Sequence, residues 1–186
     1  MRIIAGEFRG RRLTAPKGLA TRPTTDRVRE AWFSILGPLE GRVLDLYAGT
    51  GALGFEALSR GASRVTFVES SHDAGRAIES NANALGVMDR ITLLKTTVEA
   101  ATNSLRRSGP FDLIVTDPPW THMGSAELAL KRLLSAELLT ESGVLALGHP
   151  KGRPVTLSTE SGLVAYKERS WGDSAATFFI RAAESA

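Results

Sequence analysis

The sequence predicts an α/β fold: a mostly parallel β-sheet, covered by helices on both faces, that ends in an antiparallel hairpin. From residue 42 onward, short apolar runs typical of strands alternate with stretches whose apolar residues recur at helical spacing. The strand-like runs are continuously apolar, as in a parallel sheet buried on both faces. Near the C-terminus, the segments 163–169 and 175–181 are separated only by Trp171-Gly172-Asp173, which is a hairpin signal.

The chain begins with a short extension. Apolar stretches that flank two glycines predict a β-hairpin over residues 2–14, and two prolines with a glycine predict a linker over 15–23. We therefore divide the chain into a basic hairpin and linker, residues 1–23, and a main domain, residues 24–186.

The main domain opens with a helix. Thr24 or Thr25 can cap its N-terminus, Val28, Ala31, Trp32 and Ile35 recur at helical spacing, and the following Gly-Pro pair ends it. Alternation then predicts the remaining elements in order. We expect strands at 42–46, 64–69, 91–95, 111–115 and 143–147, and helices at 52–60, 72–85, 98–107 and 125–138.

Composition excludes several classes of protein. A chain of 186 residues with 42% hydrophobic and 23% charged residues has the size and composition of one globular domain rather than a disordered segment. The absence of cysteine excludes disulfide scaffolds, thiolate metal sites and cysteine nucleophiles, and the three histidines lack metal-ligand spacing. No apolar run approaches the roughly 20 residues of a membrane span. We expect a cytoplasmic protein without a metal site.

Positive charge is concentrated at the N-terminus. Residues 1–36 hold eight Lys or Arg and three Asp or Glu, a net charge of +5, whereas the rest of the chain carries −2. Such a cluster favours a polyanionic partner, although a solvated basic hairpin without a partner is the alternative.

A glycine-rich turn connects the first predicted strand to the next helix. Residues 49–54 match G-x-G-x-x-G, and Glu69 ends the following strand 20 residues after Gly49. The alternative is a tight turn without a ligand. Asp45 stands four residues before Gly49, where its charge would repel a pyrophosphate. S-adenosylmethionine has no phosphate and carries two cationic groups, so it is favoured over NAD, and Glu69 could accept hydrogen bonds from its ribose.

The tetrapeptide at 117–120, Asp-Pro-Pro-Trp, directly follows the fourth predicted strand. Two prolines cannot continue a sheet, so the chain must turn out at the carboxyl edge, where open α/β sheets bind ligands. Asp117 and the Pro118 carbonyl could accept hydrogen bonds from an exocyclic amine, and Trp120 could stack on the base. The alternative is a proline-rich surface turn.

These motifs resemble the class I S-adenosylmethionine-dependent methyltransferases and, more narrowly, the RsmD family of 16S rRNA guanine-N2 methyltransferases. The resemblance covers nearly the whole chain and includes the segments 2–6, 9–13, 22–30, 45–61 and 117–119. It implies a Rossmann-like sheet, S-adenosyl-L-methionine as cofactor, and 16S rRNA as substrate, within an assembled or assembling 30S subunit.

The resemblance also implies roles for individual residues. The catalytic set is Asp117, Pro118, Pro119 and Trp120. The cofactor-binding set is Asp45, Ala48, Gly49, Gly51, Glu69, Thr97 and Val98. The charge of the N-terminal region, rather than the resemblance, predicts an RNA-binding set: Arg2, Arg9, Arg11, Arg12, Arg22, Arg27 and Arg29.

The chain departs from the family pattern at three places. Trp120 stands where Tyr or Phe is usual, and Thr97 or Val98 must replace an Asp near the adenine. Gly148 precedes His149, where an acidic residue is often found.

Other functions remain open at this point. A DNA methyltransferase acting on adenine N6 or cytosine N4 would use the same tetrapeptide, whereas cytosine C5 methylation is excluded because it needs a cysteine. An NAD-dependent oxidoreductase and a nucleic-acid-binding module with a vestigial pocket are the remaining alternatives. We also expect that residues 1–14 can be deleted with loss of RNA binding while the rest still folds.

Overall fold

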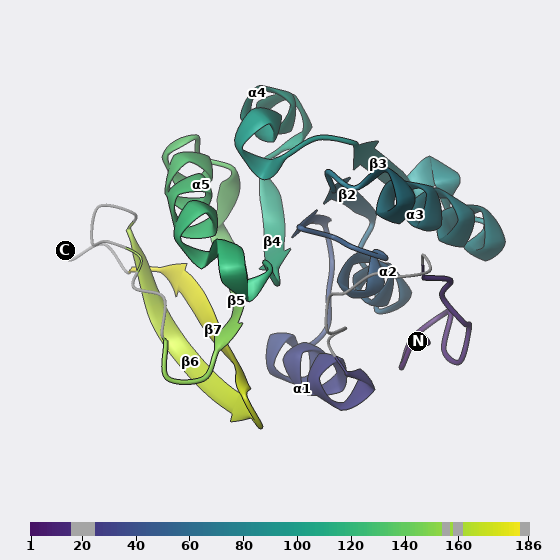
Figure 1. Cartoon of the computed structure of the whole chain (residues 1–186), viewed down its shortest axis with the longest axis horizontal. Helices are drawn as coiled ribbons and strands as arrows, with labels where there is room; N and C mark the ends of the chain where they lie inside the picture. The colour runs from purple at the N-terminus through teal and green to yellow at the C-terminus, as the bar shows by residue number, and fades with distance from the viewer. Residues whose placement is uncertain (16–24, 154–156, 158–161, 183–186) are drawn as a thin grey trace.

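A computed structural model describes residues 1–15, 25–153, 157 and 162–182 of the chain. Its centre is a seven-stranded sheet with the order β3-β2-β1-β4-β5-β7-β6 (Figure 1). The first five strands run parallel, and β7 pairs antiparallel with both β5 and β6, which confirms the predicted fold class. The strands are β1 (Arg42–Leu46), β2 (Arg64–Val68), β3 (Ile91–Leu94), β4 (Phe111–Thr116), β5 (Leu139–Pro150), β6 (Leu163–Trp171) and β7 (Ser174–Arg181).

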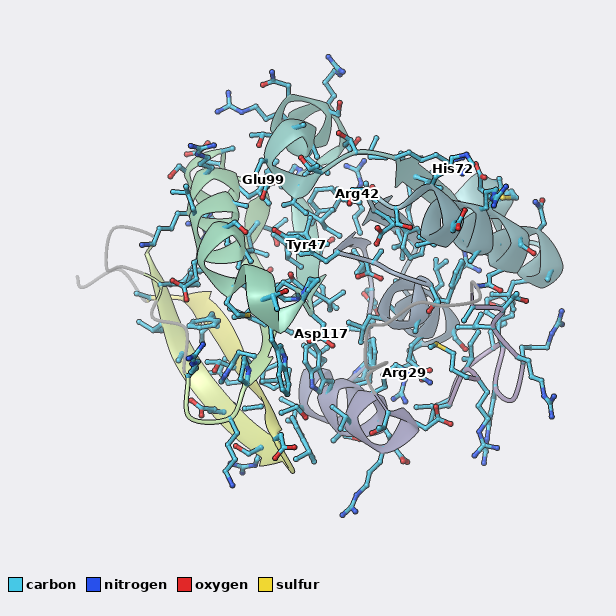
Figure 2. All side chains as sticks on the ribbon, viewed as in Figure 1. Arg29, Arg42, Tyr47, His72, Glu99 and Asp117 are labelled. Atoms are coloured by element: carbon cyan, nitrogen blue, oxygen red, sulfur yellow. The ribbon has the colours of Figure 1, made fainter. Side chains whose placement is uncertain are left out.

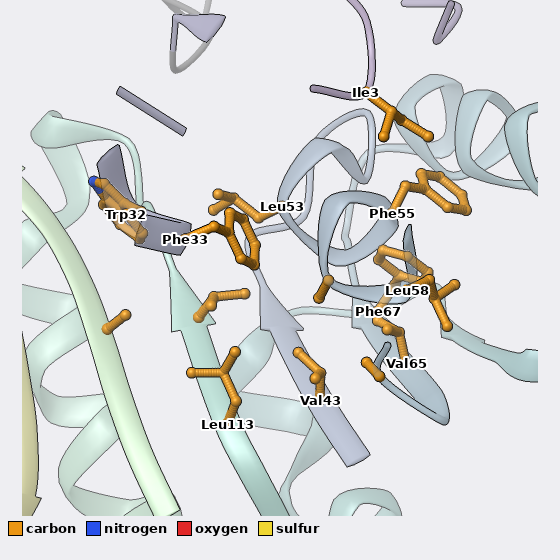
Figure 3. Close-up of a cluster of buried hydrophobic side chains, with 14 of the residues drawn as sticks. Ile3, Trp32, Phe33, Val43, Leu53, Phe55, Leu58, Val65, Phe67 and Leu113 are labelled. Carbon is orange, nitrogen blue, oxygen red and sulfur yellow. The ribbon is translucent and has the colours of Figure 1, made fainter. Parts of the chain in front are cut away.

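Helices cover both faces of this sheet. One face carries α1, α2 and α3, whose apolar side chains join the strands in a first core cluster that includes Trp32, Phe33, Phe55 and Phe67 (Figure 3). The other face carries α4 and α5, which form a second cluster with the same strands. The helices are α1 (Asp26–Leu36), α2 (Ala52–Ser59), α3 (His72–Leu85), α4 (Val98–Ser108) and α5 (Met123–Ser135), with short 3-10 helices η1 (Met88–Arg90) and η2 (Trp120–His122).

Local chemistry explains where these helices begin. The hydroxyls of Thr25, Ser71 and Thr97 accept hydrogen bonds from backbone N–H groups in the first turns of α1, α3 and α4, as N-caps do. The expected helix at 125–138 is shorter at its C-terminal end, because Glu137 has a left-handed backbone with φ of 55°. The fifth strand is correspondingly longer than 143–147, and it starts at Leu139.

The N-terminal residues are part of the core. The backbone of residues 1–3 pairs with that of 11–13 through an antiparallel bridge between Arg2 and Arg12. Ile3 and Leu13 are buried in the first cluster. Deletion of residues 1–14 would therefore open the core, and we expect it to destabilise the protein, contrary to the sequence-based expectation. The proposed domain boundary lies in 16–24, outside the described residues.

Candidate functional site

Two predicted acidic site residues, Asp45 and Asp117, lie where the strand order reverses. From β1, the next two strands of the chain, β2 and β3, are added on one side of the sheet. The strand after them, β4, lies on the other side of β1. Ligands of open α/β sheets bind at the carboxyl ends of the strands beside such a switch point. Asp45 lies near the end of β1, and Asp117 directly follows the neighbouring strand β4.

The structure requires glycine in this turn for two different reasons, a left-handed backbone and close packing. Gly49 and Gly51 have φ values of 56° and 77°, in the left-handed region that suits glycine. A Cβ at Gly54 would lie 2.2 Å from the Phe67 ring, so this glycine lets α2 pack closely on β2. A Cβ at Gly49 would meet nothing within 4 Å. The turn is therefore tightly packed below and open at Gly49, where a ligand can approach the backbone.

Asp45 lies beneath this turn. Its carboxylate is buried and accepts a hydrogen bond from the Gly54 N–H at 2.9 Å. Burial raises the pKa of Asp45 well above the ordinary value; the Gly54 hydrogen bond opposes this effect, and the charges of Glu69 and Asp117 add to it. Asp45 therefore lies within the electrostatic influence of both Glu69 and Asp117.

Glu69 is held by two backbone groups. One carboxylate oxygen accepts from Gly49 N–H and the other from Ser71 N–H, both at 2.7 Å. A carboxylate has about four acceptor positions, so this fixed side chain can still accept hydrogen bonds from a diol.

The remaining predicted cofactor residues lie in two places, one in the glycine turn and two at the start of α4. Ala48 belongs to the glycine turn and donates its N–H to the Val68 carbonyl at 3.1 Å. Thr97 caps α4, and Val98 is buried in the second core cluster. Within the described part of the chain, neither Thr97 nor Val98 is hydrogen-bonded to the turn, so their role at an adenine stays a prediction.

The predicted catalytic loop leaves the sheet at the carboxyl edge. Pro118 is buried, Asp117 and Pro119 are half-buried, and Trp120 is 39% exposed. A Cβ added to Gly148, on β5, would lie 2.4 Å from Oδ1 of Asp117 and 3.2 Å from the Trp32 ring. Asp117 therefore lies against the bare backbone of Gly148, beside the buried indole of Trp32.

Sequence reasoning missed Tyr47, which lies between Asp45 and the turn. It has a left-handed backbone with φ of 56°, unusual for an aromatic residue. Burial, together with the charge of Glu99, raises its pKa to about 12. Its hydroxyl is buried and has no hydrogen-bond partner within the described chain. Figure 2 shows Tyr47 between Glu99 and Asp117. Left-handed backbone at non-glycine residues is common at functional sites, and it cannot be predicted from residue types, so the sequence alone assigns no role to Tyr47.

The predicted RNA-binding arginines differ in exposure. Four on the N-terminal segment and one on α1 are exposed; they are Arg2, Arg9, Arg11, Arg12 and Arg27. Arg29 is buried, and its guanidinium donates to the Arg2 carbonyl and to Asp26. This corrects the expectation for Arg29, which bonds inside the protein rather than facing a phosphate. Arg22 lies outside the described residues.

Membrane spans and metal centres are not found among the described residues. No helix there is both long and apolar enough to cross a membrane. No group of three or more His, Cys, Asp or Glu side chains in the same residues could hold a metal ion.

Comparison with known proteins places this chain among relatives. A family model described as "Conserved hypothetical protein 95" matches residues 1–180. The ribosomal RNA small subunit methyltransferase D of Haemophilus influenzae is 33% identical over 92% of this chain and 89% of its own length. The protein of the same name from Escherichia coli K12 is 37% identical over 64% of this chain and 60% of its own length.

A solved structure has the same fold over nearly the whole chain. The Escherichia coli protein yhhF, which carries a provisional methyltransferase name, superposes with a TM-score of 0.81 at 31% identity over 97% of each chain. Because the family model spans nearly the whole sequence and relatives above 30% identity cover most of it, the chain belongs to the "Conserved hypothetical protein 95" family, the RsmD family that its motifs resemble.

Proposed function

We propose that this protein transfers a methyl group from S-adenosylmethionine to the exocyclic N2 amine of a guanine in 16S rRNA. The observation that carries the proposal is the adjacency of two acidic groups on neighbouring strands: Asp45, beneath the glycine turn, and Asp117, after β4. The names of the relatives, small subunit rRNA methyltransferases, support the substrate class. A cytoplasmic location and a 30S particle as the substrate form are part of the same proposal.

The residues of the turn fit this cofactor. Asp45 and Glu69 form no ion pair with a Lys or Arg among the described residues. The buried carboxyl group of Asp45, with Glu69 nearby, favours a ligand that brings positive charge. The sulfonium and ammonium groups of S-adenosylmethionine supply that charge, whereas the pyrophosphate of NAD would add to the repulsion. Gly49 leaves room for close approach, and Glu69 can bind the ribose hydroxyls.

When bound, S-adenosylmethionine supplies an electrophilic methyl group on a sulfonium. Asp117 and the Pro118 carbonyl accept hydrogen bonds from the N2 hydrogens, which turns the nitrogen lone pair toward the methyl carbon. Held in this way, the amine would take the methyl group as its bond to sulfur breaks, which would leave S-adenosylhomocysteine as the neutral thioether. The extra N2 proton would pass to water because the methylated ammonium is acidic. Alignment of this kind can supply roughly 7–11 kcal/mol. The negative charge of Asp117 stabilises the positive charge that develops on nitrogen.

The loop and the N-terminal segment would hold the RNA. Trp120 is exposed enough to stack on an extruded base, which contributes about 1–3 kcal/mol per base in other proteins. The exposed arginines of the N-terminal segment would bind phosphates and position the strand without reading its sequence.

The test is labelled methyl transfer followed by mass mapping of methylated nucleosides. Unmodified 30S particles, naked 16S rRNA and duplex DNA are incubated separately with enzyme and S-adenosylmethionine. We expect N2-methylguanosine at one position of 16S rRNA. Methylated adenine or cytosine in DNA, without RNA product, would instead establish the DNA methyltransferase alternative. Cofactor binding measured by calorimetry distinguishes both enzymes from a binding module that lacks a working pocket.

A further inference from the structure

Asn81 connects the N-terminal segment to the glycine turn. It lies on α3 and is buried, with 2% of its surface exposed. Its Oδ1 accepts from Thr14 N–H at 2.7 Å, and its Nδ2 donates to the Thr14 carbonyl at 3.0 Å. Nδ2 also donates to the Thr50 carbonyl at 3.2 Å. The two N–H groups and the carbonyl of this amide are therefore all used.

Thr50 is the residue between the two left-handed glycines of the turn. Besides its carbonyl contact with Asn81, its hydroxyl lies 3.2 Å from the Sδ of Met1 and donates to it. Thr50 is 6% exposed. Both ends of the segment 1–14, Met1 directly and Thr14 through Asn81, thus contact the same residue of the turn.

The rest of this segment is held by α2. The buried carboxylate of Glu56 accepts from the Ile4 and Ala5 N–H groups at 2.8 and 3.1 Å. The Ser59 hydroxyl accepts from Phe8 N–H at 2.9 Å. Because α2 begins at the glycine turn, the segment, the helix and the turn form one hydrogen-bonded unit.

We infer that Asn81 is a positioning residue for the cofactor turn, and that through it residues 1–14 complete the cofactor site. The inference rests on the proposed function, because it assumes that S-adenosylmethionine binds at this turn. Asn81 does not contact the cofactor in this scheme. It fixes the direction of the Thr50 carbonyl and hence of the Gly51 peptide, so that the turn, whose Gly49 N–H donates to Glu69, keeps the shape the ligand needs.

The test compares asparagines of one helix. Asn81→Ala removes all three hydrogen bonds. Asn81→Asp keeps the size and the acceptor but loses both donations, and Asn83→Ala removes an exposed asparagine two residues away. We expect both Asn81 variants to weaken S-adenosylmethionine binding about tenfold, within the range of typical coupling between sites. Turnover at saturating cofactor should change by about twofold or less, and Asn83→Ala should match the wild type.

Hydrogen exchange distinguishes local loosening of the turn from a general loss of protein stability. The Gly51 N–H bonds to the Ala48 carbonyl within the turn, so its exchange reports on opening of the turn. We expect faster exchange at Gly51 in Asn81→Ala and unchanged exchange in β1. Wild-type cofactor affinity in Asn81→Ala or Asn81→Asp would overturn the inference and leave the proposed function intact. If the wild type itself bound no S-adenosylmethionine, the proposed function would fail, and the inference with it.

Discussion

The carboxylate of Asp117 occupies the place where a side chain at Gly148 would be. An added Cβ would lie 2.4 Å from its Oδ1, closer than real Cβ contacts come. The two residues follow the paired strand positions Thr116 and Leu147, so the contact crosses directly from β4 to β5. The absence of a side chain at Gly148 therefore leaves the space that Asp117 fills.

Gly148→Ala is therefore expected to impair catalysis by displacing Asp117. The methyl group must push the carboxylate or the β5 backbone, because Trp32 closes the other side at 3.2 Å. A shift of about 1 Å at a reacting group can lower turnover roughly a hundredfold. Steady-state kinetics on the RNA substrate would measure turnover, and calorimetry should show unchanged cofactor affinity.

Gly124→Ala is the matched control for that substitution. A Cβ at Gly124 meets nothing within 4 Å, and the residue lies in the first turn of α5. Alanine there should keep full turnover and raise the free energy of unfolding by up to about 1 kcal/mol. Equal turnover in the two alanine variants would show that Asp117 does not depend on the space at Gly148.

Asp117→Ala tests the role of the carboxylate itself. Without it, the N2 amine loses both an acceptor and a negative charge at the point where positive charge develops. Loss of one such group in other enzymes costs about 10²–10³ in turnover, and we expect at least a hundredfold here. Cofactor affinity, measured by calorimetry, should change little, since the turn and Glu69 are untouched. Near-wild-type turnover would remove Asp117 from the mechanism.

The arginines predict two separable effects. Arg29→Met should lower the free energy of unfolding by about 1–3 kcal/mol, because the Arg2 carbonyl and Asp26 lose a buried partner. Arg9→Gln should leave stability within about 0.5 kcal/mol of the wild type, because Arg9 is exposed. For RNA binding, removing one arginine that neutralises a phosphate should lower the slope of log affinity against log salt by about 0.7 to 0.9. We expect that change for Arg9→Gln; an unchanged slope would mean that Arg9 contacts no phosphate.

The sequence predicted the parallel sheet and its C-terminal hairpin because apolar periodicity and turn residues are local signals. It also located the glycine turn and the loop at 117–120, since each stands directly after an apolar strand. The buried position of Arg29 was not predictable, because burial depends on how the N-terminal segment folds back onto α1.

For the same reason, the roles of Gly148 and Asn81 could not be predicted from the sequence. A glycine in a strand and an asparagine in a helix have no distinctive local pattern. Their contacts with Asp117 and with Thr50 join segments 31 residues apart in each case. Only the register of β4 with β5 and the packing of α3 beside the turn bring these pairs together.

Asp45→Asn should weaken cofactor binding and raise the free energy of unfolding by an amount that depends on pH. Because burial raises the pKa of Asp45, the folded protein keeps a proton there over a pH range in which the unfolded chain, with a pKa near 4, has lost it. The wild-type free energy of unfolding therefore falls as pH rises from about 4 through the raised pKa. Asparagine carries no charge, so the variant should not lose stability in this way as pH rises. Its side-chain carbonyl can still accept a hydrogen bond from Gly54 N–H.

We expect the Asp45→Asn variant to be more stable than the wild type at neutral pH, to show a flatter pH profile, and to bind S-adenosylmethionine at least about tenfold more weakly. Denaturant unfolding at a series of pH values measures the first two effects, and calorimetry measures the third. Asp89→Asn, at an exposed carboxyl group, is the control and should follow the wild-type profile. Parallel pH profiles for Asp45→Asn and the wild type would mean that the buried carboxyl group does not set the pH dependence of stability.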